Sequence, residues 1–122
     1  TLFPYPTLFR SHWRENVRTD TSVSIVGAEL QGADPEAMSR RWAAVLGLES
    51  DAVDGGWRIP LEGGELRFVS VQDGRGEGLG AFDVAVRDPD AVRTRARARG
   101  ALDQAGDVVL CGTRMRLVRA AP

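Results

Sequence analysis

The sequence predicts an α+β domain built from two tandem βαββ(β) units. The prediction depends on a pattern that occurs twice. A strand-like stretch ends at an Asp-Pro-acidic-Ala step and a helical pattern follows, first at Asp34 and again at Asp88. A related strand then closes each copy, Leu-Arg-Phe-Val at residues 66–69 and Met-Arg-Leu-Val at residues 115–118. A repeated order of elements sets the architecture. We therefore expect one domain over residues 22–120.

Composition allows a single domain and excludes several functional classes. The chain has 122 residues, of which 43% are hydrophobic, so it can bury one modest core. Its formal net charge of −1 argues against a nucleic-acid partner. No apolar run reaches the 18 residues of a membrane span. The only cysteine, Cys111, has no partner for an internal disulfide, which predicts a reducing, cytoplasmic location.

The first 21 residues do not fit the repeated plan. Residues 1–11 have no helical or strand period and resemble the translation of a common sequencing-library adapter, with Pro6 as the only departure. We expect this segment to be non-native and disordered, the alternatives being a signal segment or an edge strand. Residues 12–21 are polar and predict a linker, with the only histidine, His12, exposed to solvent. An adapter at this end implies that a partner domain is missing upstream.

The first unit, residues 22–72, begins with a strand whose alternation places Val26, Ala28 and Leu30 on one face. Asp34 then caps a helix that starts at Pro35 and ends at Gly47, since aspartate, proline and glycine favour these positions. The buried face of this helix is predicted from i, i+4, i+7 spacing to be Met38, Trp42 and Val45.

A hairpin and a connector complete the first unit. Residues 51–56 are expected to form a loop, and residues 57–61 and 65–71 two paired strands. Residues 72–80 hold four glycines and predict a flexible connector.

The second unit, residues 79–119, repeats the plan. Phe82, Val84 and Val86 alternate onto one face of its first strand. Asp88 caps a helix that ends at Gly100, with a weaker buried stripe at Val92 and Ala96. Residues 107–110 and 114–118 form the closing hairpin, with Cys111 at its turn. No histidine or acidic base lies near Cys111 in sequence, so nothing supports a nucleophilic role for its thiol.

These two units with Asp-Pro helix starts resemble the vicinal oxygen chelate superfamily, also called glyoxalase-like or bleomycin-resistance-like domains. The resemblance covers about residues 22–118, although each unit is expected to be one strand shorter than the usual βαβββ. It implies a curved mixed sheet with the helices on its convex face and a cup on its concave face. The chain is most similar to the C-terminal half of longer bacterial proteins with two such domains.

In this superfamily a divalent metal lies in the cup, bound by His or Gln from each first strand and by Glu or His from each last strand. Counted from the helix starts and the glycine turns, these positions fall on Gly27, Ala81, Arg67 and Arg116. Glycine and alanine have no ligand atom and arginine stays protonated, so no metal or other cofactor is predicted.

The cup face still carries charge, from three acids and three arginines: Glu29, Glu65, Asp83, Arg67, Arg114 and Arg116. One interpretation is that they form mutual salt bridges that fill the cup. The other is an anion site, in which the arginines bind a carboxylate or phosphate of a small ligand.

Three functions remain open from the sequence. The leading hypothesis is an accessory or structural domain without metal ligands, which packs against a missing N-terminal domain of the same superfamily or forms a homodimer. The alternative is a small-molecule binding module of the drug-sequestering type, with the cup as its pocket. The third is a metal-dependent lyase, isomerase or dioxygenase. No residue is assigned a catalytic role.

Overall fold

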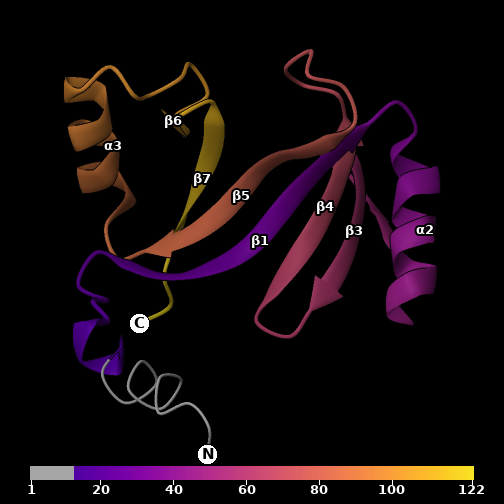
Figure 1. The fold of residues 1–122 in the computed structure, drawn as a ribbon, viewed down its shortest axis with the longest axis horizontal. Helices are drawn as coiled ribbons and strands as arrows, with labels where there is room; N and C mark the ends of the chain where they lie inside the picture. The colour runs from indigo at the N-terminus through magenta and orange to yellow at the C-terminus, as the bar shows by residue number, and fades with distance from the viewer. Residues whose placement is uncertain (1–12) are drawn as a thin grey trace, which may run out of the picture.

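The protein is an α+β fold of two helices and a seven-stranded mixed sheet, which confirms the predicted fold class (Figure 1). The computed structural model describes residues 13–122, so the adapter prediction for residues 1–11 and the predicted exposure of His12 lie outside the described part. The elements, in chain order, are a 3-10 helix at Trp13–Asn16, β1 (Ser22–Gly32), α2 (Pro35–Leu46), β2 (Asp51–Val53), β3 (Gly56–Leu61), β4 (Gly64–Ser70), β5 (Gly78–Val86), α3 (Pro89–Ala98), β6 (Val108–Leu110) and β7 (Thr113–Arg119).

The sheet has the order β2-β3-β4-β1-β5-β7-β6, with β1 and β5 antiparallel at its centre. On their outer sides, β1 pairs in parallel with β4, and β5 pairs in parallel with β7. Each half therefore joins its own first and last strands. We call the β1–β5 pairing, where the two halves meet, the seam. Figure 1 shows α2 beside one end of the sheet and α3 beside the other.

Both helices begin as their sequences predict. The Asp34 carboxylate accepts a hydrogen bond from the backbone N–H of Ala37 at 3.1 Å. The Asp88 carboxylate accepts two at the same distance, from Asp90 and Ala91. Proline occupies the first turn in each case. Gly47 ends α2 with φ 69°, in the left-handed conformation that glycine adopts without strain.

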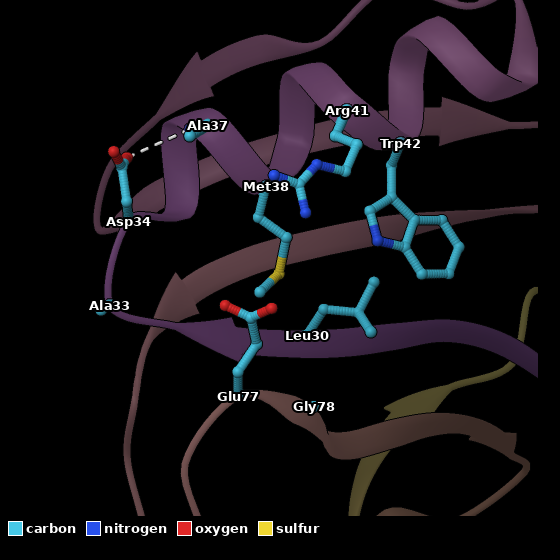
Figure 2. Close-up of a pocket in the computed structure, with 9 residues that line it drawn as sticks. All are labelled: Leu30, Ala33, Asp34, Ala37, Met38, Arg41, Trp42, Glu77 and Gly78. Atoms are coloured by element: carbon cyan, nitrogen blue, oxygen red, sulfur yellow. Dashed lines mark hydrogen bonds between the residues drawn. The ribbon is translucent and has the colours of Figure 1, made fainter.

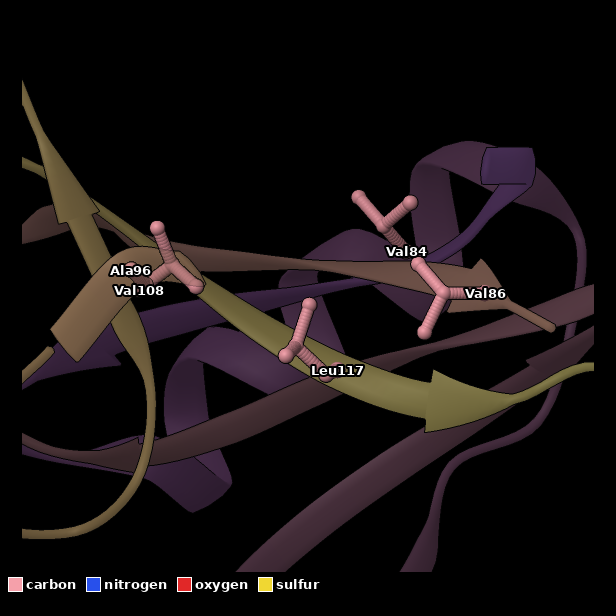
Figure 3. Close-up of a cluster of buried hydrophobic side chains, with 5 residues drawn as sticks. All are labelled: Val84, Val86, Ala96, Val108 and Leu117. Atoms are coloured by element: carbon pink, nitrogen blue, oxygen red, sulfur yellow. The ribbon is translucent and has the colours of Figure 1, made fainter. Parts of the chain in front are cut away.

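Each half has its own hydrophobic core on the helix side of the sheet. In the first half the buried cluster is Leu30, Ala43, Ile59 and Phe68. In the second half it is Val84, Val86, Ala96, Val108 and Leu117 (Figure 3). The predicted faces are confirmed for the strand residues of these clusters, because alternation leaves one choice once the apolar side is fixed; they are Leu30, Phe68, Val84, Val86 and Leu117.

The predicted buried stripe of α2 is wrong in part. Val45 is 82% exposed and Trp42 is 40% exposed, whereas Ser39 and Ala43 are buried. Small residues let the helix backbone approach the sheet, so α2 is rotated toward its serine and alanine positions. Met38 does pack against the core. Trp42 contacts Phe68 from the edge of the cluster, with ring centroids 6.2 Å apart.

Two further predictions need correction. Residues 51–53, predicted as loop, form the short strand β2, so the first half has the complete βαβββ order. In the second half an isolated bridge between Leu102 and Val108 stands in place of that strand.

The glycine-rich connector is shorter than predicted because β5 already begins at Gly78. It is also held in place, since the Gln31 side chain donates to Asp73 at 2.7 Å and to the Gly76 carbonyl at 2.9 Å.

The segment before β1 is also tied to the domain. Arg87 donates from Nε to the Thr19 carbonyl at 2.6 Å and from its backbone N–H to the Thr21 carbonyl at 3.0 Å. Neither α2 nor α3, the two α-helices of residues 13–122, is long and apolar enough to cross a membrane.

Candidate functional site

Five of the six cup residues named from the sequence meet in one group of ion pairs. Glu29 comes from β1, Arg67 from β4, Asp83 from β5, and Arg114 and Arg116 from β7. We call these five the cup cluster. Their strands lie next to one another in the order β4-β1-β5-β7, so alternation turns all five side chains to the same face. That face is opposite the hydrophobic clusters.

Arg67 lies at the centre of the cup cluster. Its Nη1 donates to Glu29 Oε1 at 2.7 Å and its Nη2 donates to Asp83 Oδ1 at 2.6 Å. The exposed fractions of the three side chains are 15%, 9% and 2%, so these are buried, charge-assisted bonds. Since Arg67 belongs to the first half and Asp83 to the second, one guanidinium bridges the seam.

The two arginines of β7 supply a second cation to each acid. Arg116 approaches Asp83 through two nitrogens, Nε at 3.1 Å and Nη2 at 3.2 Å. Arg114 donates to Glu29 and, at 3.4 Å, to Asp107. Burial lowers the pKa of Arg114, but the Glu29 and Asp107 carboxylates raise it further, so its net pKa lies above the ordinary value. Every carboxylate of the cup cluster therefore has two guanidinium partners.

Glu65, the sixth predicted residue, lies at the rim of this group. Its carboxylate is 3.4 Å from Arg58 Nη1 and 3.8 Å from Arg67 Nε, which has no hydrogen-bond partner. The sequence reasoning missed Asp107. A signal for it existed in the closing hairpin. Val109 pairs with Arg114 and so shares its face, and alternation puts residue 107 on the same face as residue 109.

Gly27 explains how Asp83 fits into the cup. A Cβ atom on Gly27 would lie 2.4 Å from Asp83 Oδ2, closer than real Cβ contacts come. The Asp83 carboxylate thus lies over the Gly27 backbone and occupies the room that a side chain at this position would need.

The fold resembles several solved structures. The sequence itself matches no protein-family description and no curated protein. Methylmalonyl-CoA epimerase from Mycobacterium tuberculosis superposes with a TM-score of 0.60 at 19% identity, over 91% of this chain and 97% of that one. A hypothetical protein from Bacillus halodurans gives a TM-score of 0.58 at 9% identity, over 81% and 95% of the two chains. The epimerase from Streptomyces coelicolor, in complex with 2-nitronate-propionyl-CoA, gives 0.54 at 17%, over 80% and 97%.

This chain has the vicinal oxygen chelate fold. The resemblance named from the sequence is confirmed at the level of the fold, whereas the placement as a C-terminal domain stays a prediction. At these identities the likeness shows the fold alone.

The cup of this domain does not fit a divalent metal. The four carried-over ligand positions hold Gly27, Ala81, Arg67 and Arg116, of which none offers a donor atom. Within residues 13–122, no group of three or more His, Cys, Asp or Glu side chains is arranged to hold a metal ion. A cation at the centre would also meet the Arg67 guanidinium, and it would have to displace arginines from Glu29 and Asp83.

A polar pocket of about 460 Å³ opens beside the cup cluster. Its lining residues are Gln72, Asp73, Arg75, Asp103, Val109, Gly112 and Arg114. Asp73 forms an ion pair with Arg75 at 2.6 Å. The hydrogen bonds from Arg75 and from Gln31 hold the pKa of the Asp73 carboxyl well below its usual range. Arg114 of the cup cluster forms part of its lining, so the pocket borders the cup, and we call it the mouth pocket.

A second pocket lies on the helix side, at the N-terminal end of α2 (Figure 2). Figure 2 shows Met38 and Trp42 reaching from the helix toward Leu30 of β1, with Glu77 on the opposite side. Its volume is about 440 Å³. This pocket accounts for the exposure of Trp42, because the indole borders an open space. No sequence motif indicated it.

Proposed function

We propose that this chain is an accessory vicinal oxygen chelate domain that works without metal ligands of its own, as one half of a larger assembly. The observation that carries the proposal is the position of Arg67 between Glu29 and Asp83. In the superfamily, the corresponding cup binds the metal. Here its centre is filled by a cation that belongs to the chain.

The cup cluster also lacks a free base. A group that abstracts a proton needs a carboxylate or imidazole with an open lone pair directed at the substrate. Glu29 and Asp83 each accept hydrogen bonds from two arginines, which occupy their oxygens. The arrangement therefore supports a structural role for these acids in this domain.

Exposed apolar side chains support a partner. Val45 is 82% exposed, and Leu46, Leu48 and Val53 are each more than 40% exposed, all within the end of α2 and the strand that follows. Apolar surface concentrated in one short segment is typical of a surface that another chain covers. The proposed occupant is the N-terminal domain of the same superfamily or a second copy of this chain. A cytoplasmic location belongs to the same proposal.

The first experiment tests the metal-free cup. The protein is dialysed against excess Zn²⁺, Mn²⁺, Ni²⁺ or Co²⁺, and bound metal is measured by mass spectrometry together with the melting temperature. We expect no stoichiometric binding and an unchanged melting temperature, because a metal that bound the folded protein would raise it. One tightly held equivalent, lost on Asp83→Asn, would contradict the proposal.

The second experiment tests the partner surface. Sedimentation velocity of the full chain is compared with that of Val45→Glu, and with Arg41→Glu as a control on the same helix. A dimer that Val45→Glu dissociates, while Arg41→Glu leaves it intact, supports the homodimer. A monomer at all concentrations leaves the N-terminal domain as the partner, which co-expression with the upstream coding region then tests.

A second candidate function is favoured by the mouth pocket. The side chain of Arg75, which lines this pocket, is 49% exposed, so it has open surface for an anion despite its acidic partner. The alternative is a small-molecule module that binds an aromatic or other carboxylate there. Titration with benzoate and salicylate tests it, with Arg75→Gln expected to weaken binding. The metal-dependent enzyme would need ligands that residues 13–122 do not supply.

A further inference from the structure

A hydrophobic groove of about 390 Å³ lies between α3 and the sheet in the second half. It opens on the helix side, and so on the face opposite the cup cluster. Its walls are mostly aliphatic, and two arginines and two hydroxyl residues complete the lining: Val86, Val92, Ala96, Ala101, Val108, Leu110, Met115, Leu117, Arg95, Arg99, Thr21 and Ser22. Figure 3 shows the short side chains that form the buried part of this region.

The second half lines its groove with smaller residues than those at the corresponding positions of the first half. The two halves align through their helix caps, Asp34 with Asp88, and through their last strands, Arg67 with Arg116. At five corresponding core positions the first half has the larger side chain: Met38 against Val92, Trp42 against Ala96, Leu30 against Val84, Ile59 against Val108 and Phe68 against Leu117.

The largest of these differences is at Ala96. In the first half, Trp42 extends from α2 and contacts Phe68 with ring centroids 6.2 Å apart. At the equivalent place on α3 there is only a methyl group, and Leu117 stands where the phenyl ring would be. The groove of the second half is therefore bordered by short aliphatic side chains, whereas the pocket of the first half is bordered by Leu30, Met38 and Trp42.

Two arginines at this groove have no acidic partner. Arg99 donates from Nη1 to the Arg95 carbonyl at 3.2 Å, and no carboxylate within residues 13–122 forms an ion pair with either guanidinium. This differs from the cup, where every arginine has a carboxylate. Aliphatic walls beside two uncompensated cations are complementary to a molecule with an alkyl chain and an anionic end.

We propose that the α3 groove binds a medium-chain aliphatic carboxylate, with the chain against Val92, Ala96 and Leu117 and the carboxylate at Arg95 and Arg99. The absence of any aromatic side chain among the lining residues favours an alkyl chain over a ring. Met115 adds an adaptable wall, since its unbranched side chain adjusts to irregular shapes. The site is independent of the cup and of the accessory role proposed above.

The test is titration calorimetry with octanoate. Decanoate, which is two methylenes longer, should bind about tenfold more tightly than octanoate, since each buried methylene contributes about 0.8 kcal/mol. Octanol and octyltrimethylammonium have the same chain with a neutral and a cationic end, and both should bind at least about threefold more weakly than octanoate, the size of one exposed ion pair. Equal binding of all three would overturn the assignment of the arginines.

Variants place the ligand. Arg95→Gln combined with Arg99→Gln should weaken octanoate binding about threefold to tenfold. The control is Arg97→Gln, which removes an arginine of the same helix that does not line the groove and should leave binding unchanged. Ala96→Trp introduces the residue of the first half and should abolish binding in a protein that keeps its circular dichroism spectrum. Binding that persists in the folded Ala96→Trp variant would refute the proposal.

The other occupant is a second copy of the chain. Sedimentation velocity with and without decanoate separates the two. A mass that stays constant while decanoate binds supports the ligand site. Dissociation of a dimer by decanoate, or by Ala96→Trp alone, would assign the groove to an interface between copies and overturn the ligand proposal.

Discussion

The replacement Arg67→Met tests whether the cup cluster is a working part of the fold. Methionine keeps much of the length of the side chain and removes the charge. The change deletes two buried bonds, of 2.7 Å to Glu29 and 2.6 Å to Asp83. A buried ion pair broken on one side costs about 3–5 kcal/mol when the remaining charge has no partner. Glu29 and Asp83 each retain an arginine of β7, so the expected cost is at the lower end, about 3 kcal/mol.

Urea unfolding followed by tryptophan fluorescence measures this cost. A loss of about 3 kcal/mol corresponds to a fall of the midpoint by roughly 1–2 M urea and of the melting temperature by about 10 °C. The matched control is Arg58→Met, which removes an exposed pair to Glu65 at 3.4 Å and should cost less than about 1 kcal/mol.

A double-mutant cycle with Asp83→Asn isolates the bond across the seam. The double variant should lose less stability than the sum of the two single losses. The reason is that Asp83→Asn removes the charge that Arg67→Met leaves with one partner fewer. The reasoning is refuted if Arg67→Met costs no more than Arg58→Met, or if the cycle gives a coupling energy near zero.

Three other outcomes follow from the described contacts. Asp88→Ala should cost about 1–2 kcal/mol and Asp34→Ala about half of that, because Asp88 accepts two backbone hydrogen bonds and Asp34 one; equal or absent losses in urea unfolding would contradict this. Gly27→Ala should destabilise the protein by about 1–3 kcal/mol through its clash with Asp83, and a neutral result would mean that this carboxylate lies elsewhere. The lowered pKa of Asp73 predicts a contribution to stability that is present at neutral pH and lost as the pH falls below the unfolded pKa of about 4, so Asp73→Asn should flatten the acid limb of the pH–stability curve.

The strand faces and helix starts were predictable because each depends on neighbouring residues in the chain. Alternation fixed the orientation of Glu29, Arg67 and Asp83 before any pairing was known. The Asp-Pro steps identified both helix starts for the same reason, since a cap acts over three residues.

The errors arose where tertiary packing decides. The rotation of α2 depends on how closely its backbone approaches β3, and the sequence gives Trp42 and Ala43 equally plausible helical spacing. Strand β2 is three residues long and forms only because β3 is beside it. Gln31 holds the connector through hydrogen bonds to residues more than 40 positions away, which no local pattern indicates. Asp107, by contrast, lies only seven residues from Arg114 and follows the alternation of its hairpin, so it was predictable.

The antiparallel pairing of β1 with β5 has a consequence for how the chain reaches this fold. Within each half, the first strand pairs with the last strand of its own unit, so each half has the contacts to form early. The seam aligns Gly27 with Asp83, which closes a longer loop than the pairing of Gly27 with Glu65 or of Ala81 with Arg114, so we expect it to form after them. During that interval one edge of β1 and one edge of β5 are open. At high concentration these edges meet those of another molecule, and we expect dimers with exchanged halves to accumulate during refolding in proportion to protein concentration.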